Sequence, residues 1–318
     1  MDYVFNESFT IDPELERIFS ESFLNIKDDK IPPYLYNLIV TPSIKIKVYP
    51  DENNIFSFYA TAKEMTIDWC DGTVDEYIPN GDYSEFYHRY TNRDFYIISI
   101  ASEAIKKFKT FSYFPSKGRI YDIKFGNCPE LNDIYFSWDI FPTLDVSRLI
   151  KLKSLSCGNG KLIALNAKGC IELQRLDCPY NQLTLLDLSD CMELRYLHCV
   201  LNQLTHLDLL DCPSLDFLNC GYNQLTQLVF DAALLHELHC SNNKLTKLDL
   251  SSCHYINSVY CSFNQLSTSA LNLLFESLPV KTPQEGFIVF EGNPGEASCD
   301  RTILERKGWR YYPTISTD

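Results

Sequence analysis

The stretch LRYLHCVLNQLTHLDL (residues 194–209) decides the fold of this chain, because close copies of it recur before and after it. Six cysteines mark the copies, at steps of 21, 21, 21, 20 and 21 residues: Cys157, Cys178, Cys199, Cys220, Cys240 and Cys261. An asparagine follows five of them by three residues: Asn181, Asn202, Asn223, Asn243 and Asn264. A fixed period predicts a solenoid, since each copy buries its apolar edge only against a neighbour.

The copies fit Leu-x-x-Leu-x-Leu-x-x-Asn-x-Leu, the leucine-rich-repeat signature, with Cys in place of the third Leu. A free Cys behaves as a small buried hydrophobe, so the replacement keeps an inward-facing column. Leu197, Leu218 and Leu238 are expected to form another inward column. We expect the short amide of each repeated Asn to bond backbone groups where the chain turns off the strand.

The second half of each copy predicts a short extended segment on the convex side, because residues 204–209 and their equivalents lack helix caps and helical spacing. A second cysteine column is expected there, with Ala233 standing in once: Cys170, Cys191, Cys212 and Cys253. Counting one period back from Cys157 reaches Phe136. Degenerate repeats therefore begin near residue 105 or 115, and the repeats are expected over residues 105–266.

The residues before the repeats change to a period of two. Strands are expected at residues 44–48, 55–58, 65–69 and 95–100, with a hairpin turn at Asp71-Gly72. This pattern indicates a small antiparallel β-sandwich over residues 43–104. Residues 1–42 form an N-terminal extension with a short helix that begins at Asp12.

Residues 267–318 predict an α/β cap that closes the open end of the solenoid. Ser267 or Thr268 begins a helix, and residues 287–290 form a last strand. Ser298 or Asp300 begins a final helix that ends at Gly308.

The run from Met65 to Val74, with residues 88–90 and 96–100, resembles the PKD-like module, which has an immunoglobulin-like fold. Cys70 stands where that family usually has Gly. Together with the repeats and the motifs at residues 270–279, 292–295 and 307–309, the chain is similar to leucine-rich-repeat surface proteins of Bacteroides-type gut bacteria. The resemblance implies a mainly β protein with an immunoglobulin-like β-sandwich before the solenoid. It also implies a non-catalytic binding or adhesion protein at the cell surface or secreted.

The charge and the apolar content of the chain limit the classes of partner that it can bind. The formal charge of -14 argues against nucleic acid. No apolar run approaches the roughly 20 residues that span a bilayer. Residues 1–30 show no export signal, which keeps a cytoplasmic location as the alternative. We expect a monomer that uses no cofactor.

The thirteen cysteines are expected to be reduced core residues. Neighbours in one column lie about 4.8 Å apart, which a disulfide tolerates, but parallel inward side chains are poorly aimed for one. No Cys-x-x-Cys pair exists, and His198 and His239 lie two repeats apart, roughly 10 Å at the strand spacing. We therefore predict no metal site.

The strand residues that flank the inward Leu face the concave surface. Ten of them form the predicted ligand-binding surface for a protein, peptide or glycan: Tyr135, Arg175, Asp177, Tyr196, His198, Phe217, Asn219, Glu237, His239 and Tyr260. The residue before each repeated Asn adds a column that either packs the edge of the stack or meets a ligand: Trp138, Tyr180, Leu201, Tyr222 and Phe263.

Two rival functions stay open. The chain could be a structural spacer that displays the β-sandwich, and an enzyme would need a polar pocket near residues 100–140. Phosphate-loop, nucleophile-elbow and metalloprotease motifs are missing from the sequence, so we predict no catalytic residues. Two acidic groups are expected to be structural: the hairpin residues Asp68, Asp71 and Asp75, and the convex ladder of Asp187, Asp208 and Asp249.

Overall fold

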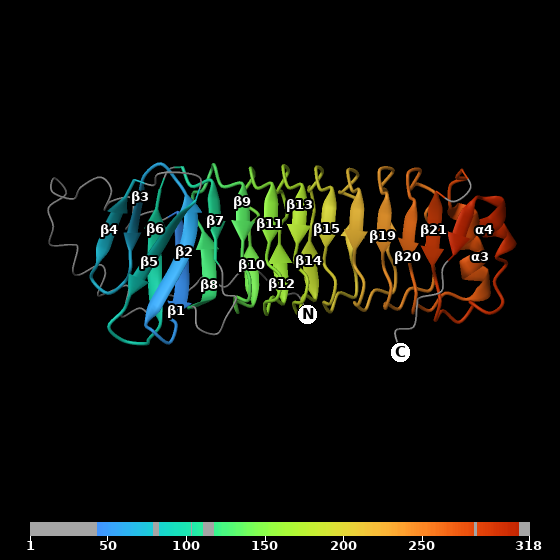
Figure 1. Cartoon of the computed structure of the whole chain (residues 1–318). Helices are drawn as coiled ribbons and strands as arrows, with labels where there is room; N and C mark the ends of the chain where they lie inside the picture. The colour runs from blue at the N-terminus through green and yellow to red at the C-terminus, as the bar shows by residue number, and fades with distance from the viewer. Residues whose placement is uncertain (1–42, 79–82, 103, 111–117, 283–284, 312–318) are drawn as a thin grey trace.

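The computed structural model describes residues 43–78, 83–102, 104–110, 118–282 and 285–311. The fold is mainly β: a solenoid of stacked coils runs between an antiparallel N-terminal unit and two short C-terminal helices (Figure 1). The predicted extension of residues 1–42, with its helix at Asp12, lies outside the described residues.

The concave side of the solenoid is one continuous sheet. Ten short strands lie parallel in it: β7 (Lys107–Lys109), β9 (Asp133–Tyr135), β11 (Ser154–Ser156), β13 (Arg175–Asp177), β15 (Tyr196–His198), β17 (Phe217–Asn219), β19 (Glu237–His239), β20 (Ser258–Tyr260), β21 (Gly286–Val289) and β22 (Trp309–Tyr311). Each coil enters the sheet in the same register, so Leu176 pairs with Leu197, and Leu197 with Leu218. The predicted parallel concave sheet is confirmed.

The convex side carries the predicted short extended segments. β10 (Thr143–Asp145), β12 (Ala164–Asn166) and β14 (Leu185–Asp187) form a three-stranded parallel sheet. β16 (Asp208–Leu209) and β18 (Val229–Phe230) form a two-stranded one. These convex strands are short and do not form one continuous sheet. The core is therefore packed mainly by the inward-facing side chains of the coils.

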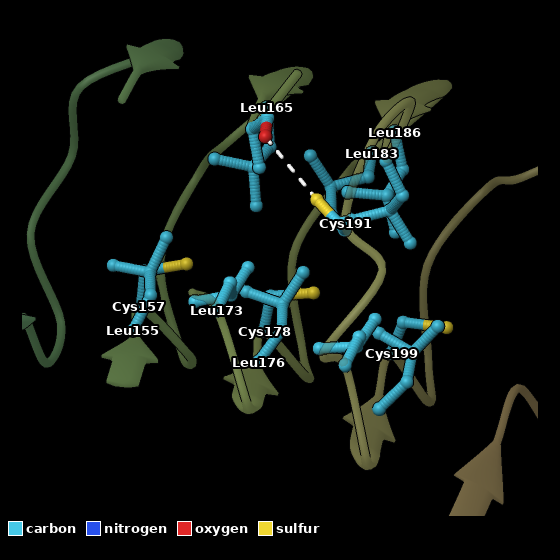
Figure 2. Packing of buried hydrophobic residues seen from close by; sticks show 14 of the residues in the cluster. Leu155, Cys157, Leu165, Leu173, Leu176, Cys178, Leu183, Leu186, Cys191 and Cys199 are labelled. Carbon is cyan, nitrogen blue, oxygen red and sulfur yellow. Dashed lines mark hydrogen bonds between the residues drawn. The ribbon is translucent and has the colours of Figure 1, made fainter. Parts of the chain in front are cut away.

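The inward columns consist of leucine and cysteine, as predicted (Figure 2). Leu176, Leu197 and Leu218 are fully buried, and so are the repeat cysteines that follow them. The second cysteine column is also buried, and the Cys191 thiol donates to the Ala167 carbonyl of the preceding coil at 3.3 Å. The stand-in for cysteine in this column is Ala232, which is fully buried, whereas Ala233 is exposed. The prediction of Ala233 was wrong because the one repeat of 20 residues moves the register by one.

The repeated asparagines form a buried ladder between coils. The Asn202 amide donates to the carbonyls of Cys178 at 3.0 Å and Cys199 at 3.1 Å, and its Oδ1 accepts from the Leu183 amide at 2.9 Å. Asn293 repeats this pattern after the inserted helix α3, with the Cys261 carbonyl at 3.0 Å. The predicted pairing of these amides with the backbone is confirmed, and each amide joins its own coil to the one before it.

The N-terminal unit shares strands with the solenoid. β1 (Ile44–Tyr49), β3 (Met65–Asp68), β4 (Val74–Tyr77), β6 (Tyr96–Ala101) and β8 (Arg119–Phe125) form an antiparallel sheet in the order β4-β3-β6-β1-β8. β2 (Ile55–Thr61) and β5 (Ser84–Arg89) extend the concave sheet beyond β7. Since β8 returns to pair with β1 after β7, neither sheet ends at the predicted boundary of residue 104.

Aromatic side chains fill the space between these two sheets. Phe58 from β2 lies 6.1 Å from the Trp69 ring and 5.3 Å from Phe108. Trp69 stacks on His88 at 4.9 Å, and the Tyr90 hydroxyl donates to the Trp69 carbonyl at 3.1 Å. The predicted hairpin turn joins β3 to β4, and Cys70 in it has a φ of 68°, the left-handed conformation that Gly favours.

The C-terminal cap closes the other end. Helix α3 (Thr268–Ser277) begins as predicted with Ser267, whose hydroxyl accepts from the Ala270 amide, and it buries Leu271, Leu274 and Phe275. Helix α4 (Thr302–Arg306) follows Asp300, which accepts from the Thr302 amide. The strand at residues 287–290 is not the last one, because β22 adds to the sheet after Gly308, where φ is 78°.

Thiol labelling tests the inward columns. All thirteen cysteines are free, eleven are buried, and only Cys70 and Cys299 are partly exposed. Burial raises the pKa of the Cys191 and Cys212 thiols to about 12, so raising the pH to 9 does not activate them. We expect an aromatic disulfide reagent to modify at most two thiols per native molecule and all thirteen in guanidinium. The double variant Cys70→Ser/Cys299→Ser lowers native labelling to zero, and fast labelling of a column cysteine in that variant would contradict the structure.

The asparagine ladder predicts a large local effect on stability. Asn202→Ala leaves the buried Leu183 amide without an acceptor and removes one of the two amide donors from each of the Cys178 and Cys199 carbonyls, so we expect the free energy of unfolding to fall by about 2 kcal/mol. The control Gln203→Ala changes an exposed neighbour and is expected to shift stability by less than about 0.5 kcal/mol. Urea unfolding followed by circular dichroism measures both, and equal midpoints for the two variants would refute the role of the ladder.

Candidate binding surface

The concave sheet brings nine of the ten predicted residues together on five neighbouring strands. β13, β15, β17, β19 and β20 present their outward side chains in two adjacent columns. The tenth residue, Tyr135 on β9, is separated from the group by the two serines of β11. We define the floor as these nine side chains: Arg175, Asp177, Tyr196, His198, Phe217, Asn219, Glu237, His239 and Tyr260.

The floor contains two stacked pairs of rings joined by a tilted contact of 43°. Tyr196 and Phe217 are parallel within 7° with centroids 4.6 Å apart, and His239 and Tyr260 stack at 4.1 Å. Phe217 and His239 join the two pairs at 5.7 Å. The Arg175 guanidinium covers the other face of Tyr196 at 3.8 Å from its centroid. Because the ring faces point at one another along the solenoid, the stack presents ring edges to solvent.

Phe287 on β21 continues this stack, and the prediction missed it. Its ring meets Tyr260 edge-on at 5.3 Å, and its backbone pairs with Ser258 in the same register as the repeats. Residues 287–290 were recognised as a strand, but the insertion of α3 breaks the 21-residue spacing that would have placed Phe287 in the column.

Two carboxylates, those of Asp177 and Glu237, fix the polar side chains of the floor. Asp177 lies 2.9 Å from His198 Nδ1 and 3.5 Å from an Arg175 nitrogen, so one carboxylate holds both. Glu237 lies 2.5 Å from His239 Nε2. Burial and the neighbouring Glu237 raise the pKa of the Tyr260 phenol, which keeps it a neutral hydrogen-bond donor. These contacts leave charges of both signs beside the ring edges.

Tyr135 belongs to a different group near the N-terminal unit. Lys109 Nζ lies 5.8 Å from its ring and 4.5 Å from the Tyr83 ring, and the Tyr83 hydroxyl donates to Asp133 at 3.2 Å. Asn219 lies in the floor, but its Oδ1 accepts from the Gly221 amide at 3.2 Å, which turns the amide toward its own loop.

The acidic side chains predicted to be structural make local hydrogen bonds. Asp187, Asp208 and Asp249 each accept from the backbone amide two residues later, at 2.9–3.0 Å. In the hairpin, Asp75 accepts from the Trp69 indole at 2.9 Å and Asp71 lies 2.7 Å from His88 Nε2. Burial raises the pKa of Asp71, but hydrogen bonds from Thr73 and His88 outweigh it and hold the pKa below its ordinary value.

The described residues hold neither a metal cluster nor a membrane span. No three of their His, Cys, Asp and Glu side chains are grouped to hold an ion. Their helices are also too short and too polar to cross a bilayer. At the junction near residues 100–140, the buried Asp139 accepts from the Thr110 hydroxyl at 2.6 Å and the Ile120 amide at 3.1 Å, which is a structural role.

The chain resembles known proteins in structure but matches no known family. No protein-family model and no curated protein matches the chain. The chain is similar to a structure titled "Functional domain of InlJ from Listeria monocytogenes includes a cysteine ladder", at 26% sequence identity and a TM-score of 0.36. The match covers 55% of this chain and 42% of that one. The chain therefore spans less than half of the structure it matches.

A double-mutant cycle tests whether the stacked rings interact. Since Tyr196 and Phe217 share a full ring face, we expect Tyr196→Ala and Phe217→Ala to couple by about 0.5–1.5 kcal/mol in the free energy of unfolding. The control pair Tyr196→Ala and Tyr260→Ala is separated by β17 and β19, roughly 14 Å at the strand spacing, and should be additive. Additivity in the first pair as well would show that the rings do not stack in solution.

Proposed function

We propose that this protein is a non-catalytic binding protein that holds a protein or peptide on the floor of its concave sheet. The single observation that supports this is the continuous surface of stacked rings and ion pairs across five strands. A leucine-rich solenoid is a suitable scaffold, because each added coil extends the surface in the same register.

The chemistry of the floor favours a protein over a glycan. A sugar packs its apolar side against an open ring face, and the faces of Tyr196 and Phe217 are covered by neighbours. Ring edges beside carboxylates, a guanidinium and histidines suit the mixed polar and apolar surface of a polypeptide. The stacking and ion pairs also order these side chains before binding, which lowers the entropy cost of association.

A structural spacer is the second candidate function. The concave sheet continues without a break into β2 and β5, and one apolar cluster extends from Ile44 to Trp309. A unit joined through both sheet and core is held at a fixed position, as the display of an N-terminal module requires. In that case the floor would have no preferred ligand.

We further propose that the N-terminal unit is a PKD-like module of immunoglobulin-like type and that the protein acts at the surface of a Bacteroides-type bacterium. The contacts among Trp69, His88 and Tyr90 support the first part, because these residues belong to the motif that carries the resemblance. The second part rests on the resemblance of the repeats and of the C-terminal motifs.

The triple variant Tyr196→Ala/Phe217→Ala/Tyr260→Ala tests the floor. A photoreactive amino acid at Asn219, in the middle of the floor, is expected to crosslink a protein partner from host or bacterial extracts, and the triple variant should remove that crosslink. The same photoreactive group at Gln227 on the convex side is the matched control. We expect the triple variant to keep its circular dichroism spectrum, and an identical set of crosslinked proteins at both positions would refute the proposed site.

A further inference from the structure

A row of large apolar side chains lies along one edge of the solenoid, outside the floor. We call it the rim and define it as Trp138, Tyr180, Leu201, Tyr222 and Phe263, each the residue before a position of the buried polar ladder. Their exposed fractions are 49%, 55%, 38%, 54% and 51%. A large part of each rim side chain is therefore accessible to a ligand.

Every rim residue has a left-handed backbone. The φ angles are 65°, 54°, 56°, 51° and 52° in chain order. This conformation costs an ordinary L-residue free energy that Gly avoids and Asn tolerates. The same column holds Asn159 and Asn242, with φ of 59° and 58°, and Gly292, with φ of 70°.

The fold thus needs the left-handed turn and not the aromatic ring. Asn at two coils of the same column satisfies the turn with a small polar residue. Tyr or Trp at this position adds backbone strain and an exposed apolar surface. Backbone strain and exposed apolar surface do not stabilise a coil. Side chains held in strained conformations are common at binding sites.

The aromatic rings of the rim are about half-exposed and do not stack on one another, unlike those of the floor. Within the described part of the chain, no ring pair and no side-chain hydrogen bond involves Trp138, Tyr180 or Tyr222. Phe263 differs, because a Cβ added to Gly292 would lie 2.4 Å from its ring, so this ring rests on Gly292. Three half-exposed aromatic rings, those of Trp138, Tyr180 and Tyr222, therefore lie at the same position of different coils.

Neutral amides accompany these rings. From Lys161 to Gln265 the residue after each ladder position is exposed and polar, and in the central coils it is glutamine: Gln182, Gln203 and Gln224. Each amide both donates and accepts hydrogen bonds without carrying charge. Only Lys161 and Lys244 bring charge to this row, and the Lys244 amine donates to Gln224 Oε1 at 3.2 Å.

The lack of charge beside the rings favours a neutral ligand over an acidic one. Open aromatic faces suit the apolar C–H side of a sugar ring, and amides and phenols suit its hydroxyl groups. The row carries no charge at Gln182, Gln203 and Gln224, so beside Tyr180 and Tyr222 it offers no opposite charge to the sulfates or carboxylates of an acidic polymer. The coils repeat at about 4.8 Å, close to the length of one sugar in an extended chain.

We propose that the rim binds a neutral, extended polysaccharide that runs along the solenoid from Tyr180 to Tyr222. This site is separate from the floor and does not depend on the function proposed for the floor. The rings hold the sugar faces, and Gln182, Gln203 and Gln224 bond the hydroxyl groups on either side.

The chain itself supplies a matched variant. Tyr180→Asn/Tyr222→Asn removes both rings and introduces the residue that the same column carries at Asn159 and Asn242. We expect its unfolding midpoint to equal or exceed that of the parent protein, since Asn tolerates the left-handed turn better than Tyr. A clearly lower midpoint would show that the rings stabilise the fold, and the proposal would fail.

Affinity electrophoresis in gels that contain soluble xylan, mannan, cellulose ether or mixed-linkage β-glucan tests the ligand. We expect at least one of these neutral polysaccharides to retard the protein. The Tyr180→Asn/Tyr222→Asn variant should bind it at least tenfold more weakly, and the floor triple variant should bind it as the parent does. Loss of retardation in the floor variant alone would assign glycan binding to the floor.

Three other outcomes would overturn the proposal. The first is that none of the neutral polysaccharides retards the parent protein. The second is retardation only by polygalacturonate, which would identify an acidic ligand. The third is self-association in sedimentation that the double Asn variant removes, because the rim would then be a contact between two copies of this chain.

Discussion

Each ladder asparagine has a buried side-chain amide. Its hydrogen-bond partners are backbone groups of two adjacent coils. The Asn202 amide donates to carbonyls of its own coil and of the preceding one, and it accepts from the Leu183 amide of the preceding coil. A buried backbone group without a partner costs free energy comparable to a lost hydrogen bond. A coil without its neighbour therefore leaves its own backbone unsatisfied, and the solenoid is stable only as a stack from Asn181 to Asn293.

The same amides fix the geometry on both sides of the turn. The asparagine must point inward at the same place in every coil, so the concave strand ends at the same residue each time. The preceding residue then takes the left-handed conformation, and the strand residues fall into straight columns. The stacking of Tyr196 on Phe217 follows from this register, because planar side chains at the strand spacing lie at the distance where rings stack.

Most of the solenoid could be predicted from the sequence, because a constant repeat period fixes which residues share a column. The inward leucines and cysteines, the Asn ladder and the composition of the floor were predictable for that reason. The misplaced Ala233 and the missed Phe287 and Asn293 lie where the period changes, at a short repeat and after the α3 insertion. The return of β8 to pair with β1 involves residues far apart in the chain, and no local pattern encodes it.

Residue type does not decide which aromatic rings can hold a ligand face to face. Tyr196 and Tyr222 are the same amino acid in adjacent coils, yet Arg175 and Phe217 cover the faces of the first, whereas the second is 54% exposed and stacks on no other described ring. The difference comes from the backbone. A strand residue lies beside its equivalents and stacks on them, whereas a rim residue lies in a left-handed turn after the strand and is about half-exposed. One repeat therefore produces two surfaces of different chemistry, a floor of ring edges and charges and a rim of ring faces and amides.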